Sequence, residues 1–170
     1  MTRKLDIQKM MGLLYELLND SSKSDRDLAK ILGVSQPTVS RMKRRLLEEK
    51  IINRYSVMPN MYKLGYRIMA LTFVKTKNLF SEEGWNPMIE DVTAWVRSKP
   101  NIVFCDTCRG MGMDGGILSF HKSYEEFDEF ISEHNFKLGK YLKECNNVLF
   151  KLGKKQALKP FDLKYLAEDR

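Results

Sequence analysis

The sequence of 170 residues predicts an α+β protein with two units. Residues 1–60 contain three segments whose apolar residues recur at spacings of three and four, the pattern of helices that pack on one another. Residues 61–156 contain strand and helix patterns in the order β-α-β-β-α-β, which is the order of a ferredoxin-like plait. Residues 157–170 form a tail whose apolar residues indicate packing, with a neighbouring subunit as one location.

The charge of the chain is uneven. The formal net charge is +7 and the pI about 9.3, a balance that suits a polyanionic partner. Residues 1–60 carry 12 Lys and Arg against 7 Asp and Glu, whereas the remaining residues carry 17 against 15. The positive excess therefore lies in the helical unit.

Three features bear on the location of the protein. No apolar run approaches the ~20 residues of a membrane span. The N-terminus is amphipathic and contains acidic residues, so it lacks the pattern of a signal peptide. Three cysteines, an odd number, favour a reducing compartment without structural disulfides. We therefore expect a cytoplasmic protein with no membrane partner.

Residues 24–55 have the local signals of two short helices joined by a tight turn. Ser24 is a good N-cap, and Gly33 can adopt the positive φ that ends a helix. Ser35 then caps a second helix with Pro37 in its first turn, where the missing N–H costs nothing. Two short helices in this order predict a helix-turn-helix.

Two flanking segments complete the helical unit. Residues 3–19 form an amphipathic helix that backs the pair and completes a three-helix core. Residues 51–57 alternate loosely and predict a short hairpin, or wing. The first 60 residues therefore predict a winged helix-turn-helix domain.

The second helix of the pair has an apolar face and a polar face. Val39, Met42 and Leu46 recur at helical spacing and face inward. The polar groups suit base edges and phosphates in a major groove. The predicted DNA-binding residues are Gln36, Pro37, Thr38, Ser40, Arg41, Lys43, Arg44, Arg45 and, from the wing, Arg54. The alternative for the basic run is a solvated helix face without a partner.

The second unit is predicted from its alternating patterns. The expected strands are 67–77, 102–109, 117–122 and 147–154, and the expected helices are 81–98 and 123–143. The first strand is partly apolar on both faces, so we expect helices on one side of the sheet and a partner on the other. This pattern indicates a homodimer or a higher homo-oligomer.

Three other motifs contain residue types that are common at chemical sites. The run GMGMDGG at 110–116 lacks the ending of a phosphate loop, and a tight hairpin or an effector loop explains it better. Cys105 and Cys108 are three apart on a strand and point to opposite faces, so half-buried thiols are expected. His121 and His134 lie among polar neighbours and are expected at the surface or at a strand end. We therefore predict no catalytic residues, no metal site and no cofactor.

The order of these elements resembles the Lrp/AsnC, or feast/famine, family of prokaryotic transcription regulators. The resemblance is carried by SDRDLAKILGVSQPTVSRMKRRLLEEKIINRY at 24–55, KLGY at 63–66 and the Gly-Asp hairpin at 110–115. It extends to about residue 154. It implies a winged helix-turn-helix domain followed by a plait of the RAM type.

The resemblance also implies partners. Family members pair through their plait sheets, often assemble further, and read pseudo-palindromic double-stranded DNA with two recognition helices. Many bind a small effector, commonly an amino acid, near the loop between the second and third plait strands. On this sequence that loop is Arg109, Gly110, Met111, Gly112, Met113, Asp114 and Gly115. It is longer and richer in glycine and methionine than the short Gly-x-x-Asp turn usual in the family.

Three functions are compatible with this two-domain plan. The leading hypothesis is a sequence-specific regulator that binds double-stranded DNA and responds to a small effector such as an amino acid. The alternative is a small-molecule-sensing interaction protein whose helix-turn-helix binds no specific DNA. Some haem-pathway decarboxylases resemble the same two-domain plan, but the sequence lacks the clustered histidine and arginine site that haem precursors need. We therefore predict that the chain is not an enzyme.

Overall fold

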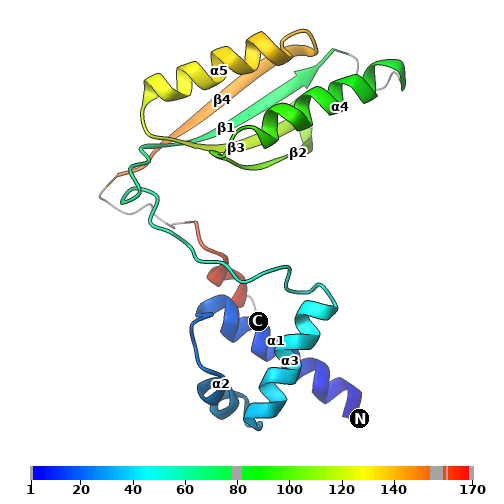
Figure 1. The fold of residues 1–170 in the computed structure, drawn as a ribbon, viewed down its shortest axis with the longest axis vertical. Helices are drawn as coiled ribbons and strands as arrows, with labels where there is room; N and C mark the ends of the chain where they lie inside the picture. Colours follow the sequence, from blue (N-terminus) through cyan, green and yellow to red (C-terminus); the bar gives the residue numbers. More distant parts are fainter. Residues whose placement is uncertain (1, 78–81, 154–158, 160, 169–170) are drawn as a thin grey trace. The chain divides into compact units, whose positions relative to one another are not determined.

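The computed structural model describes residues 2–77, 82–153, 159 and 161–168 (Figure 1). They form two compact units, which we call the helical unit and the plait unit. The helical unit comprises Met1–Met58 and Lys159–Arg170, and the plait unit comprises Pro59–Leu158. No helix among the described residues is both long and apolar enough to cross a membrane.

Three α-helices form the helical unit: α1 Thr2–Asn19, α2 Asp25–Leu32 and α3 Gln36–Glu48. The Ser24 Oγ caps α2 by accepting a hydrogen bond from the Asp27 backbone N–H at 3.2 Å, and Gly33 closes α2 with a φ of 61°. The Ser35 Oγ caps α3 by accepting from the Thr38 backbone N–H at 3.3 Å. Each cap pairs a backbone donor that the first helical turn leaves without a partner.

The three helices share one apolar core. Leu13 of α1, Leu28 of α2, and Val39 and Leu46 of α3 are fully buried within it. Burial of each such side chain contributes about 1.5–3 kcal/mol. Since α2 and α3 are too short to be stable alone, this shared core stabilises the predicted three-helix arrangement.

The segment after α3 differs from the predicted hairpin. Lys50 adopts a positive φ of 55°, and the backbone N–H groups of Ile51 and Ile52 both donate to the Leu46 carbonyl. Ile52 then packs against the core of the helical unit. Residues 53–60 contain no strand. The predicted strand pair is therefore wrong, because a hairpin needs a second strand to accept its hydrogen bonds and the described residues nearby supply none.

The C-terminal segment belongs to the helical unit. It contains a short 3₁₀ helix, η1 Leu163–Ala167, which the Asp162 side chain caps by accepting from the Lys164 backbone N–H at 3.0 Å. This helix packs against α1, and Ala167 is buried there. Phe161, Leu163 and Leu166 remain more than half exposed. The contact of this tail with a neighbouring subunit stays a prediction.

The plait unit has the predicted element order. It contains β1 Ile68–Thr76, α4 Glu82–Arg97, β2 Ile102–Gly110, β3 Met113–His121, α5 Tyr124–Leu138 and β4 Leu142–Lys151. The sheet order is β2-β3-β1-β4, and every neighbouring pair is antiparallel. This is the ferredoxin-like plait that the sequence predicts.

Both helices of the plait unit lie along one face of the sheet (Figure 1). Trp95 of α4 and Phe130 of α5 meet there, with ring centroids 5.2 Å apart. They pack in the same core as Ile68 and Ala70, two fully buried residues at alternate positions on β1. The alternate buried side chains of β1 therefore face the two helices, and the side chains between them lie on the other face of the sheet, as the alternating pattern predicts.

The other face of the sheet carries apolar side chains that no helix of the unit covers, and we call it the open sheet face. The cross-strand register aligns its residues: Met69, Leu71 and Phe73 of β1, Phe104 of β2, Leu118 and Phe120 of β3, and Val148 and Phe150 of β4. Phe104 and Phe150 at its margins are 58% and 44% exposed.

Three predicted boundaries shift in the plait unit. The β2–β3 connection is only Met111 and Gly112, whose φ values of 50° and 72° are those of a two-residue type I′ turn. As a result β3 begins at Met113 instead of residue 117, and the loop is a tight hairpin. α5 ends at Leu138 and β4 begins at Leu142, five residues earlier than predicted, because that strand pairs along the whole of β1.

Candidate nucleic-acid interface

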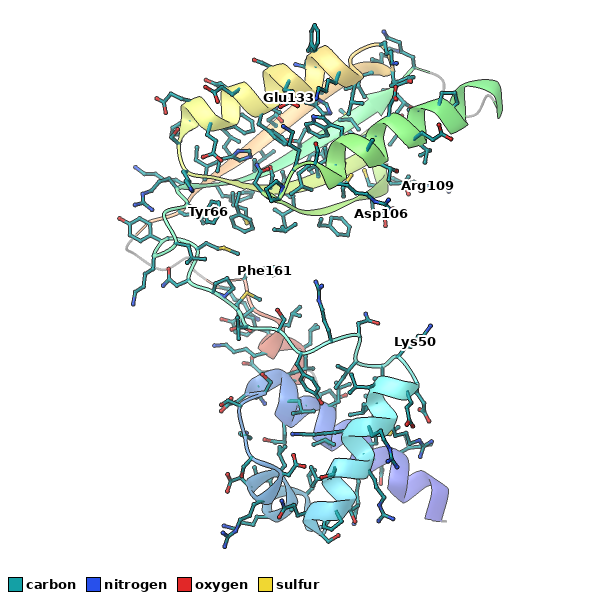
Figure 2. All side chains as sticks on the ribbon, in the orientation of Figure 1. Lys50, Tyr66, Asp106, Arg109, Glu133 and Phe161 are labelled. Atoms are coloured by element: carbon teal, nitrogen blue, oxygen red, sulfur yellow. The ribbon has the colours of Figure 1, made fainter. Side chains whose placement is uncertain are left out.

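Helix α3 presents most of the predicted DNA-binding side chains on one exposed face. Its inward side is fixed by Val39, Met42 and Leu46, which pack in the helical core. Six predicted residues of α3 are exposed: Gln36, Pro37, Ser40, Arg41, Arg44 and Arg45. Figure 2 labels Lys50, which lies just beyond the end of this helix. The face combines hydrogen-bonding groups with cations, which is the chemistry needed for base edges and phosphates.

The first turn of α3 contains a small hydrogen-bond network. The Ser35 and Thr38 hydroxyls lie 2.8 Å apart, and the Arg41 guanidinium donates to the Thr38 Oγ1 at 3.3 Å. Thr38 is half-buried. The network links the N-cap to Arg41 and so orients two predicted base-reading side chains together.

Asp25 at the start of α2 holds two residues of α3. Its Oδ1 lies 2.7 Å from the Lys43 Nζ, and its Oδ2 accepts a hydrogen bond from the Ser40 Oγ at 2.6 Å. The hydrogen bond from Lys43, followed by that from Ser40, lowers the pKa of Asp25 below its ordinary value. The carboxylate therefore stays ionised across the physiological pH range and ties α2 to α3.

Lys43 does not lie on the outward face where the sequence pattern placed it. Its side chain is only 22% exposed and is directed to Asp25. Residues 42 and 43 lie three and four positions after Val39, so they share one side of the helix with it. Because α2 packs against this side, Lys43 lies at the contact between the two helices. The structure therefore brings Lys43 to the α2–α3 contact, and its predicted contact with DNA has no geometric support.

The two arginines of the last turns form ion pairs along the helix surface. Arg44 Nε lies 3.6 Å from Glu48 Oε1, and Arg45 Nε lies 2.5 Å from Glu49 Oε1. Exposed i,i+4 pairs of this kind contribute at most about 0.5 kcal/mol, so a phosphate can replace the carboxylate at little cost. Arg54 is exposed in the segment that follows α3.

The predicted effector loop is hydrogen-bonded to the end of β1. The Asp114 Oδ2 accepts hydrogen bonds from the Thr76 backbone N–H at 2.9 Å and the Thr76 Oγ1 at 3.1 Å, and Lys75 donates to the Gly112 carbonyl at 2.8 Å. Asp114 therefore joins the hairpin to the end of β1. Arg109, Gly110, Met111 and Gly112 are exposed, whereas Met113 is buried.

Sequence reasoning missed a cavity in the plait unit, which we call the plait cavity. It has a volume of about 380 Å³ and lies between α4, α5 and the sheet. Its lining is mainly apolar and includes Val92, Trp95, Ile117 and Leu138. Of the seven residues of the predicted effector loop, Asp114 and Gly115 line it. No local signal could have revealed the cavity, because its walls come from elements far apart in the chain.

Both histidines are buried, so the predicted surface location is wrong, although His121 ends β3 and so lies at a strand end as predicted. His121 and His134 are 0% and 2% exposed. The His121 ring contacts Phe127 and Phe130 edge-on, and its Nε2 lies 2.8 Å from the Ser119 Oγ. Burial lowers the pKa of both imidazoles, which are therefore neutral core residues at pH 7.

The described cysteines are free thiols. Cys105, Cys108 and Cys145 are all half-buried, as the sequence indicates. Burial raises the pKa of Cys105 and of Cys145, which disfavours the reactive thiolate. In the described ranges no three His, Cys, Asp or Glu side chains come together to hold a metal ion.

A helix-turn-helix with a basic, amide-bearing second helix, joined to a plait, defines the class of DNA-binding transcription regulators. The comparisons agree. Residues 9–53 match the family model described as "Winged helix-turn-helix DNA-binding". LrpC of Bacillus subtilis, an HTH-type transcriptional regulator, is 27% identical over 148 residues, which cover 86% of this chain and 92% of LrpC.

Two further relationships concern the first unit and the fold. An HTH-type transcriptional regulator of Pyrococcus furiosus, PF1231, is 36% identical over 62 residues, and this match spans only 42% of that relative. The solved L-Met complex of the regulator NMB0573 of Neisseria meningitidis has a TM-score of 0.73 at 16% identity, over 93% of this chain and 97% of that one. An AsnC family regulator of Agrobacterium tumefaciens has a TM-score of 0.71 at 18% identity, over 95% and 97%.

These relationships agree with one another. The chain is similar to regulators of the Lrp/AsnC family over most of its length. The predicted fold class, a winged helix-turn-helix domain followed by a ferredoxin-like domain, is confirmed, although residues 51–60 contain no strand. Its relatives are regulators, so the prediction that the chain is not an enzyme is also confirmed.

Proposed function

We propose that this protein is a sequence-specific regulator that binds double-stranded DNA with α3 in the major groove. The observation that carries the proposal is the exposed face of α3, which sets Gln36 and Arg41 beside a cationic end at Arg44 and Arg45. Gln suits adenine, and Arg suits guanine, each by two hydrogen bonds. The buried seam of α3 holds this face in a fixed orientation on the helical core.

The two kinds of contact have different energetic roles. Phosphate contacts from Arg44, Arg45 and Arg54 supply affinity that is independent of sequence and falls with salt. A good bidentate base contact discriminates by about 1–3 kcal/mol. Arg41→Ala should therefore relax the sequence preference, whereas Arg45→Ala should weaken binding to all sequences alike.

The test is a salt titration of binding to DNA from upstream of the protein's own gene and to a scrambled duplex. Tight binding that prefers the upstream DNA and falls steeply with salt is expected. Equal, weak binding to upstream DNA and to a pool of random duplexes, with and without amino acids, would count against the proposal. The Arg41→Ala and Arg45→Ala variants then assign the roles of the two side chains.

The same proposal includes a homodimer that forms through the open sheet face. Seven accessible apolar side chains lie in register with the buried Phe120 on this four-stranded sheet, and monomers rarely leave such a surface uncovered. A two-fold pair also supplies two copies of α3 for a pseudo-palindromic site. Sedimentation equilibrium should give at least a dimer at micromolar concentration, and a monomer would refute this part.

A small apolar effector is a further part of the proposal, and the plait cavity supports it. Its volume and mainly apolar lining are those of a small-molecule site. The structural relative from Neisseria was solved as an L-Met complex, so methionine is the first candidate. A thermal-shift panel of amino acids at millimolar concentration should show stabilisation by an apolar member. A flat panel would remove the effector from the proposal.

The competing function is a small-molecule-sensing interaction protein that binds no specific DNA. The two functions separate in one pair of assays. A regulator gives sequence-preferring DNA binding, whereas a sensor gives a thermal shift with an effector and no DNA preference. In either case we place the protein in the cytoplasm, where the DNA and the amino-acid pool are.

A further inference from the structure

The hydroxyl of Ser40 has its single hydrogen committed inside the protein. Ser40 is exposed on α3, and its Oγ lies 2.6 Å from the Asp25 Oδ2 and 3.4 Å from the Gln36 carbonyl oxygen. A serine hydroxyl donates only one hydrogen bond and can accept two. The much shorter distance assigns the hydrogen to Asp25.

The partner of Ser40 can only accept. The other oxygen of Asp25 is 2.7 Å from the Lys43 ammonium group, and this ion pair is only 22% and 26% exposed at its two side chains. An ionised carboxylate has no hydrogen to donate. Ser40 is therefore the donor in its bond with Asp25, and its remaining lone pairs point to other partners.

The position of Ser40 makes this constraint relevant to DNA. Ser40 follows Gln36 by one helical turn, so both side chains lie on the same face of α3. In a helix-turn-helix the N-terminal half of the second helix contacts the base edges. The major-groove edge presents hydrogen-bond donors only at the amino groups of adenine and cytosine, whereas guanine and thymine present acceptors.

We propose that Asp25 of α2 sets the base preference of Ser40 by holding its hydroxyl as an acceptor. On this basis Ser40 selects the amino group of adenine N6 or cytosine N4 and rejects guanine and thymine at one position of the site. Asp25 touches no DNA, so it is a positioning residue. The inference rests on the proposed DNA-binding function of α3.

The variant Asp25→Asn should reverse the direction of the hydrogen bond between residue 25 and Ser40. The amide oxygen of an asparagine would turn to the Lys43 ammonium group, and its NH₂ group would turn to Ser40. The Ser40 Oγ would then accept this bond, and its own hydrogen would be free for a base acceptor. The preference at that one position should change: guanine and thymine should be admitted, and cytosine, which presents no acceptor in the major groove, should be lost.

The experiment is a selection of preferred duplexes from a random pool by the full-length wild type, Ser40→Ala, Asp25→Asn and Lys43→Met. The position at which Ser40→Ala loses preference locates the base that Ser40 reads. Loss of one neutral hydrogen bond should change affinity about twofold to tenfold at that position. If it is an adenine, replacing it by purine, which lacks the amino group, should weaken the wild type by the same factor and leave Ser40→Ala unchanged.

Lys43→Met is the matched control, because it removes the ion pair but leaves the Asp25 carboxylate as the acceptor for Ser40. It should keep the wild-type preference, and circular dichroism checks that each variant is folded. An unchanged preference in folded Asp25→Asn, or in Ser40→Ala, would overturn the inference while leaving the proposed function intact. A wild type with no preferred sequence at all would overturn both.

Discussion

Lys50 offers a sharp test of how backbone strain at the end of α3 affects stability. Its φ of 55° lies in the left-handed region, where an L-residue with a Cβ costs about 1–2 kcal/mol relative to the right-handed region. Glycine adopts this conformation without that cost, but it adds about 0.5–1 kcal/mol of chain entropy to the unfolded state. Lys50→Gly should therefore stabilise the helical unit by about 0.5–1 kcal/mol.

The hydrogen bonds at this helix end do not use the side chain of Lys50. The backbone N–H groups of Lys50, Ile51 and Ile52 donate to the carbonyls of Leu47 and Leu46 at 2.9–3.1 Å, and glycine preserves all three bonds. The gain should therefore appear in full, as a rise of roughly 2–8 °C in the melting temperature of a cooperative unit of this size.

Urea and thermal unfolding by circular dichroism measure the change. Lys50→Ala is the control, because it removes the charge and the long side chain but keeps the Cβ that causes the strain. It should leave stability nearly unchanged. If Lys50→Ala gains as much as Lys50→Gly, the cause is charge and the argument from φ is refuted.

Four further predictions concern both units. Ser24→Ala should destabilise the helical unit by about 1 kcal/mol in urea unfolding, because the first turn of α2 loses its cap. Asp114→Ala should cost the plait unit about 1–2 kcal/mol, because the end of β1 loses two hydrogen bonds to the carboxylate; an unchanged urea midpoint would contradict this role. Phe150→Asp should convert the proposed dimer to a monomer in sedimentation, and a persistent dimer would place the interface elsewhere. Burial of His121 and His134 lowers their folded pKa values below the unfolded value near 6.5, so the unfolded state takes up protons first as the pH falls. The urea midpoint should therefore be constant above about pH 7 and fall between about pH 6.5 and 5.5, and a midpoint that rises there would contradict neutral core histidines.

Local signals in the sequence were reliable where neighbouring residues decide the structure. Ser24, Gly33 and Ser35 cap and end their helices through contacts within three or four positions, so the helix-turn-helix was predictable residue by residue. The alternation of β1 between Ile68 and Val74 fixed its two faces for the same reason. Even the exposed face of α3 followed from its helical period.

The predictions from the sequence were wrong where a residue far away in the chain determines the position of a side chain or the start of a strand. Residue 43 looks like part of a basic face, but Asp25 of another helix draws it inward. His121 looks polar among its neighbours in sequence, yet the register with β1 and the aromatic rings of α5 place it in the core. The strand β4 begins at Leu142 because β1 offers hydrogen bonds along its whole length, which no local pattern records.

The sequence alone determined the two-unit plan, the family resemblance and the helix proposed to bind DNA, because caps, periodicity and turn residues act over a few positions. Only the tertiary structure decided which polar groups on α3 are free to meet DNA and which are held by α2. It also decided that the glycine-rich hairpin is joined to β1 by Asp114 and that a cavity opens between α4, α5 and the sheet. The physical reason is that hydrogen-bond partners and cavity walls come from residues far apart in the chain, and their positions depend on the packing of whole elements.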